Sequence, residues 1–392
     1  MSWSITPLGE FADVLRGVTF SKADAYSAPD DNRLAVLRAG NISEQLELRE
    51  DLAYVDKRFV SNVQQLQRND IVMCMSSGSA SVLGKSALLN EDWRGSFGAF
   101  LATIRVRSES ACPRYLSHFF RTPEFRTWAS ASSGIGIKNI RASDLRVHPI
   151  PLPPLEEQKR IAAILDQADA LRRLRRRALD RLNTLGQTIF HEMFGADSNL
   201  PMIKIEDCVE RITNGYVGAT RDIYVAKGVP YILARQIKNG QLLFDEKTFI
   251  TEAFNEKNKR SKLKSGDVLM VQSGHIGETA VVPPEHEGHN CHALIVMTPR
   301  IRMIIGKFFS AALSTRRMRQ EYQLIKTGQT LPHLNCRDVK KLAIPVPTIE
   351  AQRRFVEVTS QIDRSVSELR TALELAEQAF ASLQHRAFRG EL

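Results

Sequence analysis

The sequence has few cysteines and no long apolar run, and these shortages exclude several classes of protein. Its five cysteines are odd in number, scattered, and never spaced as Cys-x-x-Cys, so we expect reduced thiols rather than a disulfide framework. No run of about 18 apolar residues is present to span a membrane. The first residues, Met-Ser-Trp-Ser-Ile-Thr-Pro, lack the charged and apolar regions of a secretory signal. We therefore expect a cytoplasmic protein.

Signatures of several catalytic classes are also missing. No Gly-x-Ser-x-Gly, His-Glu-x-x-His or Asn/Asp-Pro-Pro-aromatic sequence occurs, so the residues for covalent hydrolysis, zinc proteolysis and amino-methyl transfer are lacking. The segment from Gly78 to Ser86 has five residues between its glycines, where a phosphate-binding loop needs four. We interpret it as a flexible Gly/Ser loop. A stand-alone nucleotide-dependent enzyme built around Lys85 stays open as the alternative.

A histidine-rich segment is the one candidate for a metal site. His286-Glu-Gly-His289-Asn-Cys291-His292 holds four possible ligands in seven residues. Its spacing matches no structural zinc pattern, and the aligned segment Phe97-Gly-Ala-Phe100 offers no ligand at all. The prediction is an exposed polar loop without a metal.

The chain is long enough for several domains and carries a basic net charge. Its 392 residues, 43% of them hydrophobic, are enough for more than one core. A net charge of +10 and an isoelectric point of about 9.4 attract the chain toward a polyanion. Composition therefore favours, without establishing, a nucleic-acid partner.

The chain contains an internal repeat. Ile150-Pro-Leu-Pro-Pro-Leu-Glu-Glu-Gln158 returns as Ile344-Pro-Val-Pro-Thr-Ile-Glu-Ala-Gln352, an offset of 344 − 150 = 194 residues. The same offset places Asp144 on Asp338, and upstream the segment 36–42 aligns with 231–237 after small insertions. A repeat of this extent indicates a tandem duplication. Because the copies differ at most side chains, they suit the reading of two targets better than one active site.

The repeat divides the chain into four expected domains. Residues 1–149 and 196–342 contain short β-branched runs broken by Gly, Ser, Asn and Asp turns, which predicts two α/β modules. A helical stretch is expected to close each module, near 113–128 and 304–325. Residues 150–195 and 343–392 are expected to be helical spacers. The predicted fold class is α/β, with two duplicated α/β modules separated by two long helices that pair as an antiparallel coiled coil with pseudo-twofold symmetry.

Apolar residues repeat at heptad spacing in each spacer. The pattern runs from Ile161 to Ile189 and from Phe355 to Leu383, which predicts one helix of about 35 residues, or about 50 Å, in each copy. Arg175 falls at a core position and is expected to need a carboxylate or water there. Antiparallel pairing would hold the two modules apart like a ruler, so that they touch a duplex about one turn apart, at about 34–36 Å. The alternative is two packed helices that merely join domains.

Polar loops recur at matched places in the two modules. Arg, Lys, Asn and Gln make paired contacts to base edges, whereas Ser, Thr and backbone amides hold phosphate. The candidate DNA-binding residues of the first module are Thr19, Ser21, Lys22, Arg38, Asn41, Ser77, Ser79, Lys85, Lys138, Asn139 and Arg141. Those of the second are Tyr216, Thr220, Arg235, Gln236, Lys238, Ser273, His275, Gln329, Thr330 and His333.

The repeated Ile-Pro-x-Pro segment followed by a long helix resembles the specificity subunit of type I restriction-modification systems. The resemblance covers the whole chain, although the second copy has Thr348 for Pro154 and Ala351 for Glu157. It implies a non-enzymatic subunit that reads an asymmetric bipartite double-stranded DNA site and carries two methyltransferase subunits, which use S-adenosylmethionine. It also implies motor-nuclease subunits that use ATP and Mg²⁺, while this chain binds no cofactor. A coiled-coil adaptor without DNA specificity is the remaining alternative.

Overall fold

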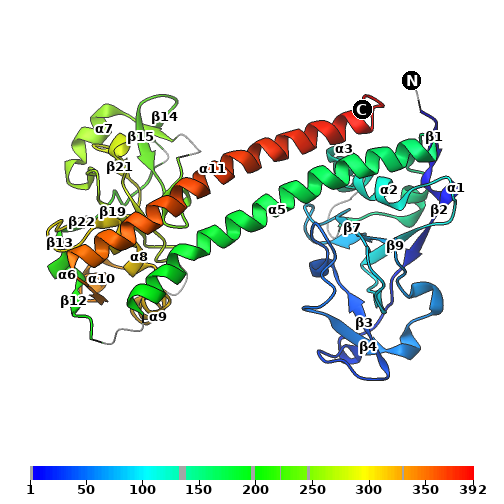
Figure 1. Cartoon of the computed structure of the whole chain (residues 1–392), viewed down its shortest axis with the longest axis horizontal. Helices are drawn as coiled ribbons and strands as arrows, with labels where there is room; N and C mark the ends of the chain where they lie inside the picture. The colour runs from blue at the N-terminus through cyan, green and yellow to red at the C-terminus, as the bar shows by residue number, and fades with distance from the viewer. Residues whose placement is uncertain (1–2, 132–137, 196–198, 221, 245–247, 329–330) are drawn as a thin grey trace. The chain divides into compact units, whose positions relative to one another are not determined.

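The chain folds into two compact units. The computed structural model describes residues 3–131, 138–195, 199–220, 222–244, 248–328 and 331–392. Unit 1 comprises Met1–Leu174 together with Leu373–Leu392, and unit 2 comprises Arg175–Ala372 (Figure 1). The C-terminal segment therefore packs with the first module, although it follows the second module in the sequence.

Unit 1 is built on antiparallel strands in the order β2-β9-β5-β7. A second sheet, β4-β3-β8, adds the parallel pair of β3 and β8, and two short ribbons are formed by β1 with β11 and by β6 with β10. The strands are β1 (Ile5–Pro7), β2 (Ala12–Arg16), β3 (Arg33–Leu37), β4 (Ala53–Asp56), β5 (Ile71–Cys74), β6 (Ser76–Ser77), β7 (Ser86–Leu88), β8 (Gly95–Phe97), β9 (Leu101–Val106), β10 (Lys138–Asn139) and β11 (Pro149–Pro151).

The helices of unit 1 cover this sheet and complete its core. Ile104 and Met73 from the sheet pack with Tyr115 and Phe125 from the helices, and all four are buried. Besides the first part of α5, the helices are α1 (Leu8–Phe11), α2 (Pro113–Phe119), α3 (Pro123–Ala131) and α4 (Ala142–Arg146). The apolar runs in β5 and β9 are buried on both faces, which explains their nearly continuous hydrophobic sequence.

Unit 2 repeats the plan. Its main sheet has the order β13-β22-β19-β20, a second has the order β14-β18-β15-β21, and β12 pairs with β23 and β16 with β17. The strands are β12 (Met202–Lys204), β13 (Val209–Asn214), β14 (Tyr224–Val225), β15 (Val229–Ile232), β16 (Ile237–Lys238), β17 (Gln241–Leu242), β18 (Phe249–Ile250), β19 (Val268–Val271), β20 (Thr279–Val281), β21 (Asn290–Cys291), β22 (Leu294–Pro299) and β23 (Ala343–Pro345). The helices are α6 (Ile205–Cys208), α7 (Glu252–Lys257), α8 (Gly306–Leu313), α9 (Arg316–Ile325) and α10 (Cys336–Val339), beside parts of α5 and α11.

Each predicted closing helix is in fact two helices. In unit 1 the break lies between α2 and α3, and in unit 2 it lies between α8 and α9. Threonine caps both second helices: Thr122 Oγ1 accepts from the Phe125 amide at 3.2 Å, and Thr315 Oγ1 accepts from the Met318 amide at 3.3 Å. Pro123 also lacks the amide that would continue the first helix.

The two spacer segments are long helices, as the heptads predict. Helix α5 (Leu155–Phe194) has 40 residues and α11 (Ile349–Ala387) has 39. In unit 1, Arg160 Nη2 donates to the Leu392 carbonyl at 2.9 Å and the Arg172 guanidinium lies over the Phe380 ring, so the two segments run in opposite directions there.

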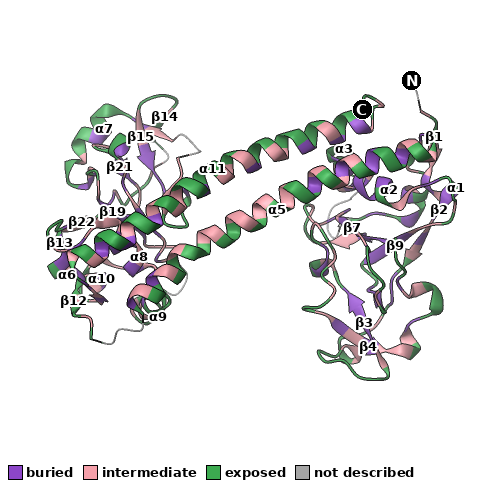
Figure 2. Cartoon of the chain, viewed as in Figure 1, coloured by how far each residue is buried: buried purple, intermediate pink, exposed green. Residues whose placement is uncertain are grey.

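The helix segments in unit 2 also run in opposite directions. Phe190 packs edge-on against Phe355 with ring centroids 5.6 Å apart, and Arg175 Nη1 donates to the Ala372 carbonyl at 3.0 Å. The partner of Arg175 is thus a backbone carbonyl, and not the carboxylate or water that its core heptad position predicts. The stretch 171–189 of α5 has no buried residue, as Figure 2 shows. Among the helices of the described residues, none is long and apolar enough to cross a membrane.

The glutamine that ends each repeated motif has the same role in both copies. Gln158 Oε1 accepts from the Cys112 amide at 2.8 Å, and its Nε2 donates to the Ser110 and Pro153 carbonyls at 2.8 and 2.7 Å. Gln352 repeats this set with the Ile305 amide at 2.9 Å and with two carbonyl oxygens at 3.0 and 2.9 Å. Both side chains are fully buried. The motif therefore fastens each long helix to its own module.

Candidate nucleic-acid interface

Two of the predicted loops of unit 1 meet at a short β-ribbon. Strand β10 pairs antiparallel with β6, so that Lys138 lies opposite Ser77 and Asn139 lies opposite Ser76. These segments are about sixty residues apart in the sequence. Because the ribbon joins them, the Gly/Ser loop after Ser77 and the segment that leads to Arg141 form one surface.

A third predicted loop lies beside the same surface. The amides of Gly17 and Val18 donate to the carbonyls of Leu101 and Phe97 at 3.3 and 2.8 Å, which places the loop 17–22 against the turn between β8 and β9. A Cβ on Gly17 would collide with the Gly98 carbonyl oxygen, so glycine is required for this approach. The loop at Gly17 and, through the Met75 and Ser76 amides, the segment that leads into the β6–β10 ribbon therefore both contact this turn.

The Gly/Ser loop is held by its own hydroxyls and by α3. Ser77 Oγ accepts from the Ser79 amide at 3.1 Å, and Arg126 Nη2 donates to the Ser81 carbonyl at 2.5 Å. Gly84 has a φ of +70° and packs against Ala129, where a Cβ would come within 2.6 Å. After Lys85 the chain forms strand β7, not the helix that a phosphate-binding loop precedes. The loop thus has the architecture of a surface loop, and not of a nucleotide site.

Unit 2 reproduces this arrangement with different side chains. Ser273 forms an antiparallel bridge with His333, at the places that Ser76 and Asn139 occupy in unit 1. Gly277, with a φ of +87°, packs against Tyr322 as Gly84 packs against α3. A groove of about 430 Å³ opens here, and it is lined by Gly274, His275, Ile276, Glu278, Arg319, Gln323, Lys326, Leu331 and Pro332.

The loop that begins at Gly215 corresponds to the loop at Gly17. The amides of Gly215 and Tyr216 donate to the Leu294 and Cys291 carbonyls at 2.7 and 2.9 Å, as Gly17 and Val18 donate in unit 1. The Tyr216 ring is half-buried because it packs edge-on against Phe254, with centroids 4.9 Å apart. The same fold therefore carries an aromatic side chain where the first copy has Val18.

Two predicted contact residues are buried and leave the candidate set. Asn41 is 2% exposed; its Oδ1 accepts from the Arg38 amide at 2.8 Å and its Nδ2 donates to the Glu50 and Asp51 carbonyls. Gln236 is 1% exposed and its Oε1 accepts from the Leu233 amide at 2.9 Å. Both side chains shape their own loops and cannot reach a base edge in this conformation.

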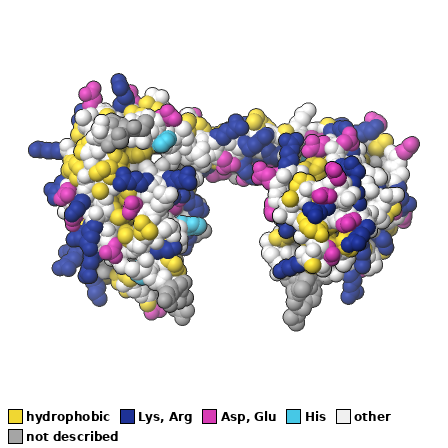
Figure 3. Space-filling model, turned by 90° about the horizontal axis from the view of Figure 1, so that it is seen from below, with side chains coloured by type: hydrophobic (Ala, Val, Ile, Leu, Met, Phe, Trp, Pro, Cys, Tyr) yellow, Lys and Arg dark blue, Asp and Glu magenta, His cyan; other side chains and the backbone are white. Residues whose placement is uncertain are grey.

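The other predicted residues differ in exposure. Those that are exposed are Thr19, Ser21, Lys22, Arg38, Ser79, Asn139, Arg141, Arg235, Lys238 and His275. Those that are partly buried are Ser77, Lys85, Tyr216, Thr220, Ser273 and His333. The side chain of Lys138 and the whole of Gln329 and Thr330 lie outside the described residues. Figure 3 shows Lys and Arg side chains spread over the visible face of each unit rather than gathered in one block.

The loop after each buried amide is tied to a long helix. In unit 1, Arg172 of α5 pairs with Glu44 at 3.0 Å and with Asp169 at 2.6 Å, and Arg121 of the module also pairs with Asp169 at 3.2 Å. Burial would raise the pKa of Asp169, but the Arg121 charge and the hydrogen bonds from Arg172 and Arg121 outweigh it and lower that pKa. The carboxylate thus stays charged at the junction of module and helix.

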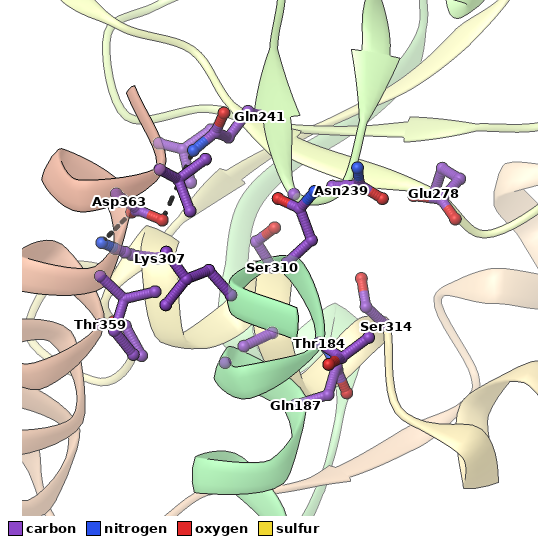
Figure 4. A pocket seen from close by; sticks show the side chains of 18 of the residues that line it. Thr184, Gln187, Asn239, Gln241, Glu278, Lys307, Ser310, Ser314, Thr359 and Asp363 are labelled. Carbon is purple, nitrogen blue, oxygen red and sulfur yellow. Dashed lines mark hydrogen bonds and ion pairs between the residues drawn. The ribbon is translucent and has the colours of Figure 1, made fainter. Parts of the chain in front are cut away.

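Unit 2 makes the equivalent junction around a cavity of about 280 Å³. Asp363 of α11 pairs with Lys307 and accepts a hydrogen bond from Gln241 Nε2 at 3.5 Å, as Figure 4 shows. Lys307 Nζ also donates to Ser360 Oγ at 3.0 Å. These polar groups satisfy one another, so we interpret the cavity as part of the attachment to the helix and not as a ligand site. Sequence reasoning missed both junctions because their members are far apart in the chain.

The histidine-rich segment is not the exposed loop that the sequence predicts, because His286 and Cys291 are buried. His286 Nδ1 and His289 Nδ1 are 3.2 Å apart, and burial lowers the pKa of both rings. Burial also raises the pKa of the Cys291 thiol to about 12, so it stays protonated. Across the described part of the chain, no group of three or more His, Cys, Asp or Glu residues could hold a metal ion.

A family model described as the type I restriction modification DNA specificity domain matches residues 2–184 and again 199–376. The chain belongs to this family of type I restriction-modification specificity subunits. The two matches correspond to the two halves of the duplication. The DNA specificity subunit predicted from the sequence is thereby confirmed, whereas neither the nucleotide-dependent enzyme nor the adaptor has support.

Relatives of this specificity subunit match along its whole length. It is 28% identical to the specificity subunit of the type I restriction enzyme StySPI of Salmonella potsdam, over 100% of this chain and 89% of the relative. It is 27% identical to the EcoKI specificity subunit of Escherichia coli strain K12, with the same coverage. The crystal structure of an S subunit from M. genitalium has the same fold, with a TM-score of 0.57 at 16% identity over 99% of this chain and 96% of that one.

Proposed function

We propose that this specificity subunit reads an asymmetric bipartite DNA site, with one half-site read by the module of each unit. The recurrence of one loop arrangement with changed side chains is the observation that supports this most. Ser76 and Asn139 in unit 1 correspond to Ser273 and His333 in unit 2, on the same backbone pairing. A shared scaffold with different donors and acceptors suits two different base sequences.

We also propose that the chain is a scaffold and does no chemistry itself. Two methyltransferase subunits would dock on it and supply S-adenosylmethionine chemistry, and motor-nuclease subunits would contribute ATP- and Mg²⁺-dependent cleavage. The target-recognition modules would span 1–149 and 196–342, with helical spacers at 150–195 and 343–392, and the complex would work on DNA in the cytoplasm. The purified chain alone should therefore not methylate DNA. Methyl transfer by the isolated chain would overturn this.

The proposal is tested directly by asking whether substitutions in one module alter recognition of one half-site and leave the other unchanged. Replacing Lys138 and Asn139 by Ala should relax or abolish recognition of one half-site only, because a lost base-edge contact costs about 1–3 kcal/mol at its own position. Replacing Gln329 and His333 by Ala should affect only the other. Arg107→Ala, at an exposed residue just after the end of β9, is the control. Adenine-methylation sequencing of host DNA reports the surviving sequence, and changes in both half-sites from one variant would contradict the proposal.

The paired helices would set the gap between half-sites as an antiparallel coiled coil. The Arg175 to Ala372 contact marks facing positions in α5 and α11. Inserting seven residues beside each should lengthen both helices by about 10 Å at 1.5 Å per residue, or about three base pairs. The tolerated gap should grow while both half-sites stay the same. An insertion in α5 alone is the control, because it breaks the pairing register and should destabilise the protein. A folded double-insertion variant with an unchanged gap would refute the spacer.

A further inference from the structure

Phe100 is an exposed aromatic residue in the turn between β8 and β9 of unit 1. Its side chain is 67% exposed. Single exposed apolar residues are common on protein surfaces and carry no meaning by themselves. The position of Phe100 is informative because it lies in the turn between β8 and β9, which the loop at Gly17 contacts on one side and β6 on the other.

The backbone around this ring is fixed. The Leu101 amide donates to the Gly98 carbonyl at 2.8 Å, which closes a tight turn with Phe100 as its third residue. The Phe100 carbonyl accepts from the amides of both Met75 and Ser76, at 2.9 and 3.1 Å. Only the side-chain torsions of the ring remain free, so ordering it against a ligand costs little entropy.

The second module lacks this ring. Leu294 takes the place of Leu101, since its carbonyl accepts from Gly215 as that of Leu101 accepts from Gly17. The residue before it is Ala293, with a φ of +47°. The turn of unit 2 is one residue shorter, because only His292 and Ala293 separate Cys291 from Leu294, whereas three residues separate Phe97 from Leu101. The turn that carries the exposed aromatic is therefore specific to unit 1.

We infer that Phe100 makes an apolar contact with the bases of the half-site that unit 1 reads. The ring emerges among loops that carry Lys22, Ser79 and Asn139, all exposed, which suits a surface whose rim meets phosphates and whose centre meets bases. Two contacts fit a phenylalanine there: packing on a thymine methyl group in the major groove, or insertion between base steps as a wedge. The inference rests on the proposed reading of one half-site by each unit.

The test measures DNA binding by the complex of this chain with its modification subunits, on a duplex that carries the bipartite site found by methylation sequencing. Phe100→Ala should weaken binding by about 5- to 150-fold, the equivalent of the ~1–3 kcal/mol of a base–aromatic contact. The slope of affinity against salt should stay unchanged, because no phosphate contact is lost. Lys22→Ala should instead reduce that slope. Phe100→Trp should retain most of the affinity.

The controls separate the base contact from other roles. Ile5→Ala removes an apolar side chain of similar exposure, 69%, from a different sheet of the same unit and should leave binding unchanged. Thymine would be replaced by uracil at one position of the half-site at a time. A replacement that reproduces the loss of affinity caused by Phe100→Ala would identify a contact with the thymine methyl group. With 2-aminopurine placed in the half-site, a fluorescence increase that requires the Phe100 ring and is lost in Phe100→Ala would show that the base is unstacked, and would identify a wedge.

Several results would overturn the inference. Unchanged binding by Phe100→Ala would do so, and so would a loss of assembly with the modification subunits, since the ring would then belong to a protein interface. Failure of the unaltered complex to discriminate its site from random DNA would instead defeat the proposed function, and the inference with it. The two failures are distinguished because only the second affects the unaltered protein.

Discussion

Replacing Gln158 by Leu should lower the free energy of unfolding of unit 1 by about 3–5 kcal/mol. The substitution nearly preserves volume but removes three hydrogen bonds from a fully buried side chain. Each is worth about 1 kcal/mol net, and the amide and two carbonyls left without a partner add a desolvation penalty. Gln167→Leu is the control, because this glutamine is exposed on the same helix.

Tryptophan fluorescence can follow this unit alone. All three tryptophans, Trp3, Trp93 and Trp128, belong to unit 1. With a urea slope of about 2 kcal/mol/M, Gln158→Leu should move the fluorescence midpoint down by roughly 1.5–2.5 M. Gln352→Leu makes the same change in unit 2, so it should move the circular-dichroism transition and leave the fluorescence transition nearly in place.

Gln158→Glu refines the prediction. One carboxylate oxygen can still accept from the Cys112 amide, but the other would face the Ser110 and Pro153 carbonyl oxygens. The folded state would raise the pKa of this buried acid, so its proton is favoured there. The deficit should therefore shrink as pH falls, because the protonated acid donates to one carbonyl. A Gln158→Leu midpoint equal to that of Gln167→Leu would refute the argument.

Two further outcomes follow from the packing within the units. In unit 2, Arg211 on β13 pairs with the buried Asp267, whereas in unit 1 the equivalent Asp70 pairs with Arg105 on β9, the neighbouring strand. Arg211→Thr and Thr298→Arg should each lower the free energy of unfolding by about 3 kcal/mol. The double variant, which moves the arginine to the neighbouring strand, should recover most of that loss. A double variant no more stable than either single one would contradict this. Burial beside Trp128 lowers the pKa of His148 from 6.5 to about 4. The neutral ring therefore contributes its full stabilisation above pH 6.5, and the free energy of unfolding should fall as the pH drops towards 4. We expect a fall of ~1–2 kcal/mol, less than the full pKa shift implies, because the ring is only half-buried and solvent screens its charge. His148→Phe should flatten this part of the stability–pH curve, and an unchanged curve would exclude the ring as its cause.

The elements with a strong local pattern could be predicted from the sequence. The heptads of α5 and α11 and the duplication were visible because both depend on spacing along the chain. The loops at Ser77 and Lys138 could be selected individually, but their pairing through β6 and β10 depends on tertiary contacts that no spacing encodes. The packing of Leu373–Leu392 with unit 1, in contrast, agrees with the antiparallel pairing that the heptads predict.

Residue type alone does not show whether an Asn or Gln side chain hydrogen-bonds to its own loop or is exposed on the surface. Asn41 and Gln236 were chosen because amides recognise bases, yet an amide equally satisfies the backbone of a tight turn. Arg38, which precedes the 3-10 helix Ala39–Asn41, and Arg235, which lies in the 3-10 helix Ala234–Gln236, are both exposed. The sequence gives no reason to select Phe100 as a contact, since an aromatic residue in a β-rich module is usually part of the core.

The duplication itself offers a physical criterion for separating scaffold from readout. The buried carboxylates Asp70 and Asp267 are both neutralised, at 2.7 and 2.6 Å, although Arg105 reaches one from β9 and Arg211 reaches the other from β13. The partner has changed strand while the pairing has been kept, because an unpaired buried charge is costly. The change from Asn139 to His333 involves no buried charge: Asn139 is exposed, and the partly buried His333 ring contacts Thr327 Oγ1 at 3.4 Å and the Leu331 carbonyl oxygen at 3.3 Å within its own loop. We therefore interpret a substitution between the copies that is compensated by another substitution in the same unit as one that maintains the fold. A substitution without such compensation is available to change the contacts with DNA.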